Sequence, residues 1–192
     1  MLYVVRHGRT AHNAARRLLG RLDVPLDEVG RRQAQALGRV PALSGAARVV
    51  SSPLQRALDT AAAIGPPVSV DERWAEIDYG IFDGCELPGA AELWEGWDRD
   101  LAYQPEGGES LAELGRRVRR ACDDLWQEAA EVDVVVVSHV SPIKAAVAWA
   151  LGVGDEICWR TFLDTASITV IGPGRRGPTL RSFNDTAHRP GG

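Results

Sequence analysis

Three short apolar runs predict the strands of a parallel sheet. They are Leu2 to Val5, Arg48 to Ser51, and Asp133 to Ser138, the last with four consecutive valines. A short run without polar alternation is typical of a strand that is buried on both faces. The first run stops at Arg6-His7-Gly8, and the other two run into Ser-Pro pairs that interrupt the strand pattern.

Helical patterns follow the second and third of these strands. Ser52-Pro53 opens a segment that ends near Ile64 at Gly65-Pro66-Pro67, and Ser141-Pro142 opens an alanine-rich segment to about Leu151. Serine suits the N-cap of a helix and proline its first position, so both helices are predicted to begin at these pairs. Strand followed by helix, repeated, predicts parallel strands joined by crossovers.

Two longer helices and two further strands complete the predicted layers. One helix runs from Asp27 to about Val40, and the other from Ser110 to about Ala130, where Ser110 and Glu113 are placed to form a capping box. Two strands, Ser167 to Ile171 and Thr179 to Asn184, flank a Gly/Pro-rich turn. The pattern predicts an α/β fold, a three-layer sandwich around a mostly parallel central sheet.

The segment from about 78 to 108 departs from this pattern and is expected to form a lid-like insertion. It is rich in glycine, proline and aromatic residues, with a short helix expected from Ala90 to Ala102. Most of its apolar side chains are expected to form a satellite core. Its apolar residues include Ile81, Phe82, Leu87, Leu93, Trp94, Trp97 and Tyr103.

Length and charge narrow the class of protein. The chain has 192 residues, a net charge of −4 and 45% hydrophobic residues, which suits one domain over 1–192 with one core. This charge gives no basic field for nucleic acid, so the expected partner is a small molecule.

The oligomeric state and the cysteines complete this picture. The sequence does not decide between a monomer and a dimer. The three cysteines form no C-x-x-C pair, which argues against a disulfide framework and a cysteine-rich zinc site.

The first residues and the apolar runs bear on location. Arg6 follows only five residues, which leaves no space for the apolar region of a signal peptide. The longest apolar run, Ala145 to Leu151, is too short to span a bilayer. We therefore expect a cytoplasmic protein without a membrane partner.

Several common enzyme motifs are missing from the sequence. Lys144 is the only lysine and lies outside any Gly-Lys-Ser/Thr sequence, so there is no phosphate-binding loop of the nucleotide-triphosphatase type. G-x-S-x-G and H-E-x-x-H do not occur either. Gly172 to Gly177 spells G-x-G-x-x-G, but a strand follows it where a dinucleotide site requires a helix.

Cationic and imidazole side chains are predicted to meet at one edge of the sheet. Ligands of open α/β sheets bind outside the carboxyl ends of the strands, and these strands deliver two imidazoles and two guanidiniums to that edge. Like charges repel unless an anion lies between them, and arginine forks match phosphate oxygens. The pattern therefore predicts a phosphoryl site. Its residues are Arg6, His7, Arg56 and His139.

Five ordered motifs together cover almost the whole chain. They are Arg6-His7-Gly8-Arg9-Thr10 with Asn13, Ser51-Ser52-Pro53-Leu54-Gln55-Arg56-Ala57 with Thr60-Ala61, Glu76 with Gly80 and Gly84, Gly107-Gly108-Glu109-Ser110, and Val137-Ser138-His139. In this order they resemble the histidine phosphatase superfamily, in its phosphoglycerate-mutase-like branch. The Ser138 to Lys144 segment is similar to α-ribazole-phosphatase-like members and to a phosphatase domain fused to ribonuclease H in some bacteria.

The resemblance implies hydrolysis of a phosphomonoester through a phosphohistidine, without metal or cofactor. His7 would attack phosphorus, and Glu76 would donate a proton to the leaving oxygen and later accept one from water. Arg6, Arg56 and His139 complete the implied catalytic set. The residues implied to bind substrate are Arg6, Asn13, Gly20, Arg56 and Val140. Because Glu76 must be protonated to act first, turnover is expected to be faster below neutrality.

Three alternatives remain open. The chain lacks the Arg-Arg-Ser-Tyr type element that the family's mutases carry, which favours hydrolysis, but phosphoglycerate mutase activity is still possible. A phospho-ligand binding module without turnover is the alternative from a different class. Glu76 could also be a structural partner of Arg73. Arg9 and Val140 depart from the Glu and Gly that many members have at these positions.

Overall fold

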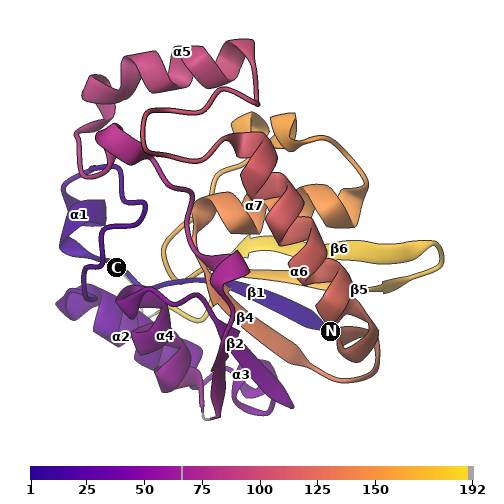
Figure 1. Cartoon of the computed structure of the whole chain (residues 1–192). Coiled ribbons are helices and arrows are strands. Elements are labelled where there is room, and N and C mark those ends of the chain that lie inside the picture. Colours follow the sequence, from indigo (N-terminus) through magenta and orange to yellow (C-terminus); the bar gives the residue numbers. More distant parts are fainter. Residues whose placement is uncertain (66, 190–192) are drawn as a thin grey trace.

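A six-stranded sheet of order β3-β2-β4-β1-β5-β6 forms the centre of the computed structural model, which describes residues 1–65 and 67–189 (Figure 1). The strands from β3 to β1 are parallel, β5 is antiparallel to β1, and β6 is antiparallel to β5. The mostly parallel sheet is thus confirmed. The strands are β1 (Leu2–Arg6), β2 (Arg48–Ser51), β3 (Val68–Val70), β4 (Val134–Ser138), β5 (Ile168–Gly174) and β6 (Gly177–Asp185).

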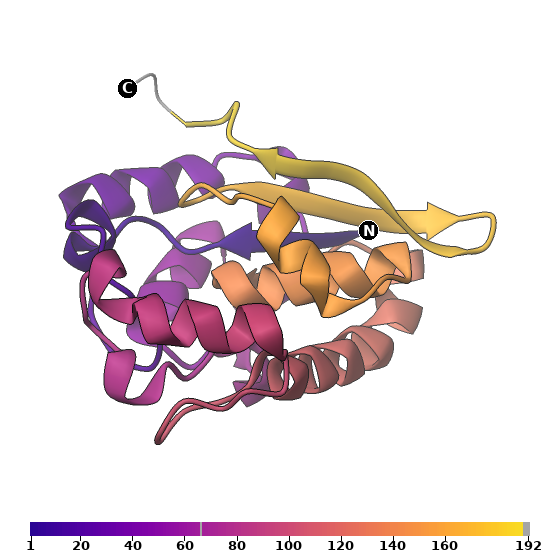
Figure 2. The same ribbon diagram turned by 90° about the horizontal axis from the view of Figure 1, so that it is seen from above.

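Helices cover both faces of the sheet, as the three-layer prediction requires (Figures 1 and 2). One face carries α2 (Glu28–Leu37), α3 (Pro41–Ser44) and α4 (Gln55–Ile64), and the other carries α6 (Leu111–Glu131), α7 (Val140–Leu151) and the 3-10 helix η4 (Asp155–Arg160).

Across the described part of the chain, no helix is long and apolar enough to cross a membrane.

The valines of β4 divide the core into two clusters. Val134 and Val136 pack among the residues of α6 and α7, whereas Val135 and Val137 pack against α2 and α4. All four side chains are fully buried. The unbroken valine run therefore does form a strand that is buried on both faces.

The predicted start was right for α6 and wrong for the helices that follow β2 and β4. Ser110 accepts a hydrogen bond from the Glu113 N–H, and the Glu113 carboxylate accepts one from Ser110, which confirms the capping box. Helix α4 begins at Gln55 rather than at Pro53, and the Ser52 hydroxyl accepts a hydrogen bond from the Leu54 N–H (3.3 Å) and also contacts His139 (Oγ to Nε2, 2.7 Å). Helix α7 begins at Val140. Pro66, part of the turn predicted after α4, lies outside the described residues.

The segment from 78 to 108 packs onto the main core. The side chains of Leu93 and Trp97 are buried in the same cluster as α6 and α7, so the expected separate satellite core is not seen. In Figure 1 this segment, with α5, lies beyond the end of the sheet, near α1 (Ala11–Ala14). Its helices are the 3-10 helices Gly80–Phe82 and Leu87–Ala90 and helix α5 (Ala91–Arg99). A lid function stays a prediction.

Two glycines hold the loop after β1 against α2. A Cβ on Gly8 would lie 2.5 Å from the Gly30 carbonyl oxygen, and a Cβ on Gly30 would collide with the Arg9 carbonyl oxygen. That same Arg9 oxygen accepts a hydrogen bond from the Asp27 N–H at 3.0 Å. This close approach fixes the backbone that follows His7.

Candidate active site

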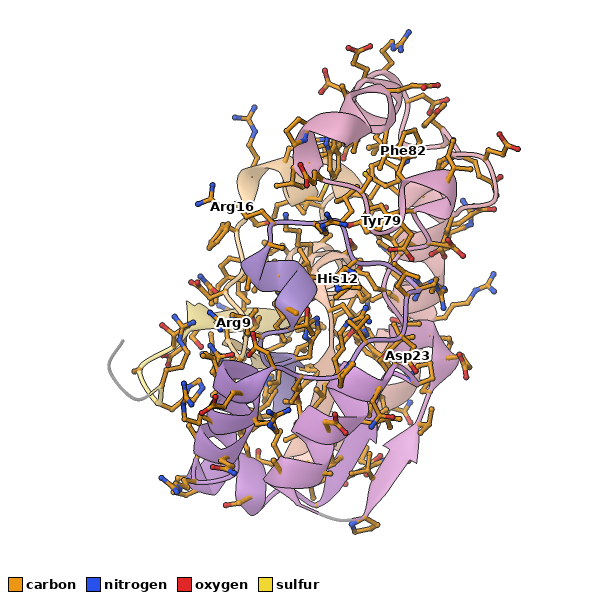
Figure 3. All side chains as sticks on the ribbon, turned by 90° about the vertical axis from the view of Figure 1, so that its left-hand side faces the viewer. Arg9, His12, Arg16, Asp23, Tyr79 and Phe82 are labelled. Carbon is orange, nitrogen blue, oxygen red and sulfur yellow. The ribbon has the colours of Figure 1, made fainter. Side chains whose placement is uncertain are left out.

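The register of β1 and β4 brings the two predicted histidines together. Arg6 pairs with Ser138, so the next residues, His7 and His139, leave neighbouring parallel strands at the same level. Their ring centroids are 5.0 Å apart. Figure 3 looks onto this side of the molecule, with α1 and its His12 in front and Tyr79 and Asp23 above and below it. The expected convergence at the carboxyl ends of the strands is confirmed.

The His7 ring is buried and held in one tautomer. Its Nδ1 lies 2.7 Å from the Gly8 carbonyl oxygen, which can only accept, so Nδ1 carries the proton and Nε2 keeps its lone pair. Burial lowers the pKa of His7 well below its ordinary value, and the charges of Arg56 and Arg6 lower it further. The structure therefore presents a neutral imidazole with a free lone pair.

Both guanidiniums are fixed by backbone carbonyls and keep unpartnered N–H groups. Arg56 is fully buried and donates to the carbonyl oxygens of Leu22 (2.8 Å) and Gly20 (2.7 Å). Arg6 donates to Leu163 O at 2.6 Å. The Nε atoms of Arg6 and Arg56 are buried and lack a hydrogen-bond partner within the described residues. Burial lowers the pKa of Arg56 to about 10, which leaves it cationic at neutral pH.

The Glu76 carboxylate lies on the N-terminus of α7. It is buried and accepts hydrogen bonds from the N–H groups of Val140 and Ser141, both at 3.1 Å. The alternative that Glu76 pairs with Arg73 is wrong, since Arg73 instead forms ion pairs with Asp71 and Asp124. The predicted acid therefore faces the same edge as the histidines, held by helix N–H groups.

His139 is fully buried beside Ser52. Its Nε2 lies 2.7 Å from Ser52 Oγ, and its Nδ1 is buried without a partner in the described part of the chain. Burial lowers the pKa of His139 well below its ordinary value, and Arg56 and His7 add to this shift. Sequence reasoning assigned Ser52 only to a helix cap, so its contact with the second histidine was missed.

These two shifts predict a stability that falls in mild acid. Because His7 and His139 stay neutral when folded, the unfolded chain binds more protons below its ordinary histidine pKa of 6.5. The free energy of unfolding, measured with denaturant, should fall by about 1.4 kcal/mol per pH unit for each histidine. His139→Gln should remove one histidine's share of that slope. An unchanged slope in this variant would contradict the buried neutral state.

The remaining predicted substrate-binding residues differ in which hydrogen-bonding groups they leave free for a substrate. Asn13 accepts from the Thr10 N–H through Oδ1 (3.1 Å), which leaves its Nδ2 amide as a donor. Gly20 donates its N–H to Asp83 and accepts from Arg56, so both polar backbone groups are bonded within the protein. The Val140 N–H is bonded to Glu76. Contacts of Gly20 and Val140 with substrate stay predictions.

A third arginine joins the site, and sequence reasoning missed it. Arg21 directly follows Gly20, whose carbonyl oxygen accepts from Arg56, and the positive charge of Arg21 contributes to the lowered pKa of His139. The buried Nε of Arg21 has no partner in the part of the chain that the structure describes, and Nη2 lies 3.9 Å from the Glu109 carboxylate. In a chain where almost every basic residue is arginine, only its position next to Gly20 could have drawn notice.

Taken together, the site is a buried cluster of cationic N–H donors around a neutral histidine. Unpartnered donors in a buried position are costly unless a ligand accepts from them. A tetrahedral oxyanion supplies several acceptor oxygens and the negative charge that balances the guanidiniums. No group of three or more His, Cys, Asp or Glu side chains that could hold a metal is found within residues 1–65 and 67–189.

Curated relatives match most of the chain. The bifunctional protein Rv2228c of Mycobacterium tuberculosis is 41% identical over 178 residues, which cover 88% of this chain and 49% of that protein. The chain thus spans about half the length of that relative. A protein of Yersinia pestis named as probable phosphoglycerate mutase GpmB is 31% identical over 201 residues, covering 97% of this chain and 94% of that one.

A solved structure and a family description agree with this fold and its motifs. A mutant phosphoserine phosphatase from Entamoeba histolytica in complex with phosphoserine superposes with a TM-score of 0.88 at 27% identity, covering 97% of this chain and 98% of that one. The phosphoglycerate-mutase-like fold is thereby confirmed. Residues 2–186 match the family described as histidine phosphatase superfamily (branch 1). The chain belongs to the histidine phosphatase superfamily, branch 1.

Proposed function

We propose that the chain is a phosphomonoester hydrolase that transfers the phosphoryl group of a small phosphorylated metabolite first to His7 and then to water. The observation that carries this proposal is the geometry of His7 itself. Its Nδ1 proton is bonded to Gly8 O and its ring is neutral, so the Nε2 lone pair is ready to attack phosphorus. A neutral imidazole nucleophile splits one difficult displacement into two easier steps.

The first step forms the bond from His7 Nε2 to phosphorus and breaks the bond to the ester oxygen. Glu76 gives its proton to that oxygen as the alcohol leaves. In the second step Glu76 takes a proton from water, the water oxygen attacks phosphorus, and the bond to Nε2 breaks. Fixed cations at Arg6 and Arg56 stabilise the charge on the transferring oxygens, with donors from His139 and Asn13.

The choice between hydrolase and mutase is settled by the products of one substrate. A relative is named as a probable phosphoglycerate mutase, whereas a structural neighbour is a phosphatase with bound phosphoserine. With 3-phosphoglycerate, a hydrolase yields glycerate and phosphate, and a mutase yields 2-phosphoglycerate. We expect phosphate release from 3-phosphoglycerate and from p-nitrophenyl phosphate. Tight binding of both without any turnover would instead indicate a binding module.

The proposed acid predicts a rate that depends on the leaving group. Glu76→Gln should reduce kcat/KM for an alkyl phosphate by about 10²–10⁴-fold, because an alkoxide leaves poorly without a proton. p-Nitrophenolate leaves unprotonated, so the loss with p-nitrophenyl phosphate should be much smaller. The wild-type rate with the alkyl phosphate should rise below neutrality. Equal losses for both substrates, or a rate that still rises through about pH 8, would contradict this role for Glu76.

A further inference from the structure

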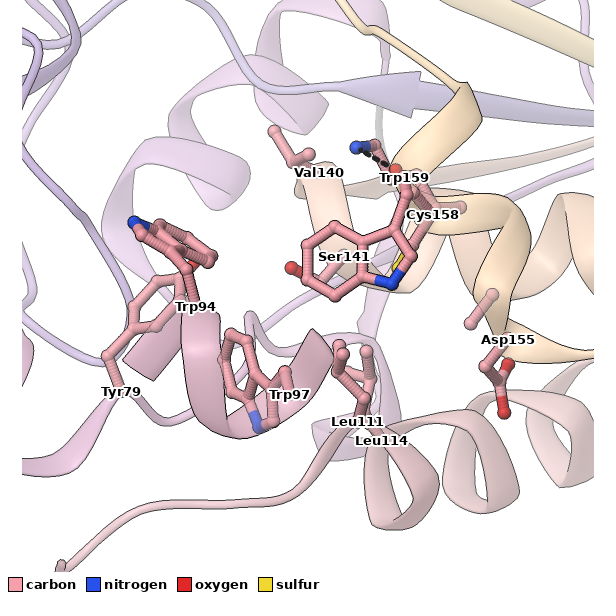
Figure 4. A pocket seen from close by; sticks show the side chains of 12 residues that line it. Tyr79, Trp94, Trp97, Leu111, Leu114, Val140, Ser141, Asp155, Cys158 and Trp159 are labelled. Carbon is pink, nitrogen blue, oxygen red and sulfur yellow. Dashed lines mark hydrogen bonds between the residues drawn. The ribbon is translucent and has the colours of Figure 1, made fainter. Parts of the chain in front are cut away.

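A cavity of about 130 Å³ lies between α5, α6, α7 and η4, next to the phosphoryl site (Figure 4). Aromatic rings from distant parts of the chain line it, with Tyr79 and Trp94 on one side and Trp159 facing them from η4. Trp159 is 43% exposed, and Trp94 is half-buried. Ring surface therefore remains available to a ligand.

The rings stand at steep angles to one another and form separate walls. Trp94 and Trp97 have centroids 5.8 Å apart with planes at 61°, and Trp94 and Trp159 are 6.5 Å apart at 86°. This arrangement offers both ring faces and ring edges to a bound group, the two geometries in which aromatic rings prefer to meet. The size also fits, since an apolar cavity of about 150 Å³ is known to bind benzene.

The cavity begins where the leaving oxygen would depart. Val140 and Ser141 line it, and their N–H groups bond to Glu76, the proposed proton donor. Tyr79 also lines it, and the Tyr79 ring packs so closely on Gly20 that a Cβ there would lie 2.8 Å from Cδ2. From Val140 the lining continues to Lys144, four residues or about 6 Å along α7.

The charged side chains around the cavity indicate whether it suits a cationic or a neutral ligand. Aromatic cages often bind quaternary ammonium groups, but this cavity holds Lys144, which donates to Cys158 O at 2.8 Å and has no carboxylate partner within the described residues. Burial lowers the pKa of Lys144, so the environment already disfavours positive charge. The carboxylate of Asp155 is engaged by Arg119 at 2.9 Å. A neutral ring fits better than a cation.

We propose that this cavity binds a neutral planar aromatic ring in the alcohol part of the substrate, joined to the phosphate by a short linker. This inference rests on the proposed phosphomonoester hydrolysis. It adds a substrate class, an arylalkyl type of phosphate ester, with Trp94 and Trp159 as residues that determine specificity. The alcohol leaves with its ring still in the cavity, and the proton from Glu76 reaches the ester oxygen next to Val140.

Three esters whose leaving alcohols have similar acidity test the proposal. Wild-type protein should hydrolyse 2-phenylethyl phosphate with a kcat/KM about tenfold or more above that of ethyl phosphate. The kcat/KM for 2-phenylethyl phosphate should also be about fivefold above that for 2-cyclohexylethyl phosphate, which has the same number of carbons in a puckered ring. Trp94→Ala and Trp159→Ala should each remove most of both preferences, because the rate with 2-phenylethyl phosphate falls toward the rate with ethyl phosphate.

Trp126→Ala is the matched control, because Trp126 is also half-buried and also stacks edge-on against a tryptophan, Trp149, but lies outside the cavity. It should keep both preferences. Equal rates for the three esters, or a preference for phosphocholine over 2-phenylethyl phosphate, would overturn the proposal while phosphomonoester hydrolysis stands.

A binding measurement keeps the test independent of turnover. 2-Phenylethylphosphonate, which cannot be hydrolysed at its carbon–phosphorus bond, should bind about tenfold more tightly than ethylphosphonate by isothermal titration calorimetry. Trp94→Ala should lose this difference and Trp126→Ala should keep it. If no ester is hydrolysed, the proposed function fails, and the phosphonate pair still decides the cavity: equal affinities would overturn it.

Discussion

His7→Ala is expected to reduce the release of phosphate from p-nitrophenyl phosphate by roughly 10³-fold or more, to a level near background. The variant removes the buried imidazole whose Nε2 lone pair is proposed to attack phosphorus. His139 lies 5.0 Å away by ring centroids, but its Nε2 is engaged with Ser52. The guanidiniums carry no lone pair for attack.

Folding and binding should survive the loss of His7, which makes the result specific. The His7 side chain makes one hydrogen bond, to its neighbour Gly8, and Arg6 and Arg56 keep their own carbonyl partners. Inorganic phosphate should therefore still raise the melting temperature of the variant. His188→Ala, at the other end of the chain, should keep full activity. A His7→Ala protein with more than a few per cent of wild-type turnover would rule out the histidine nucleophile.

Arg56→Ala is expected to lower both activity and stability. Loss of the guanidinium removes a fixed cation from the transferring phosphoryl group, which should reduce kcat/KM by about 10²–10³-fold. It also leaves the carbonyl oxygens of Gly20 and Leu22 without their donor, at about 1–3 kcal/mol for each one that stays buried. Rates with p-nitrophenyl phosphate and denaturant unfolding measure the two effects separately.

Two further variants separate charge, geometry and packing. Arg56→Lys keeps a cation but lacks the planar fork of separate nitrogens with which Arg56 bonds the Leu22 and Gly20 carbonyl oxygens, so it should recover only a small part of the activity. Arg31→Ala is the control, because Arg31 likewise donates to a backbone carbonyl, that of Leu26, but from the exposed face of α2. It should leave the rate unchanged. Normal kinetics in Arg56→Ala would contradict the phosphoryl site.

The buried strands and the capped helix were predictable because their signals are local. The four valines of β4 define a strand by themselves, and Ser110 with Glu113 define the start of α6. Strand β3 was not predicted, since its three residues, Val68–Val70, are too few to show a strand pattern. Near the starts of α4 and α7, Ser52 and Glu76 bond to groups across the fold, which no local pattern contains.

The residues of the site also fall into those with a local sequence signal and those placed only by tertiary contacts. His7 and His139 could be predicted because each directly follows a recognisable strand, and parallel register then places them side by side. The contact of Ser52 with His139, and the position of Arg21 next to the Gly20 carbonyl that Arg56 binds, depend on loops that cross the edge of the sheet. The aromatic cavity combines α5 with η4, segments about 60 residues apart whose meeting is a property of tertiary packing alone.

The most direct test is to look for the phosphohistidine itself. Wild-type protein mixed with a phosphomonoester in the cold and quenched in alkali within the first turnover should gain the mass of one phosphoryl group, and fragment spectra should place it on His7. With p-nitrophenyl phosphate, whose leaving group needs no proton, Glu76→Gln should accumulate more of it, because water is then activated less well. If wild-type and Glu76→Gln proteins release phosphate without ever carrying the adduct, water attacks the substrate directly and His7 is not the nucleophile.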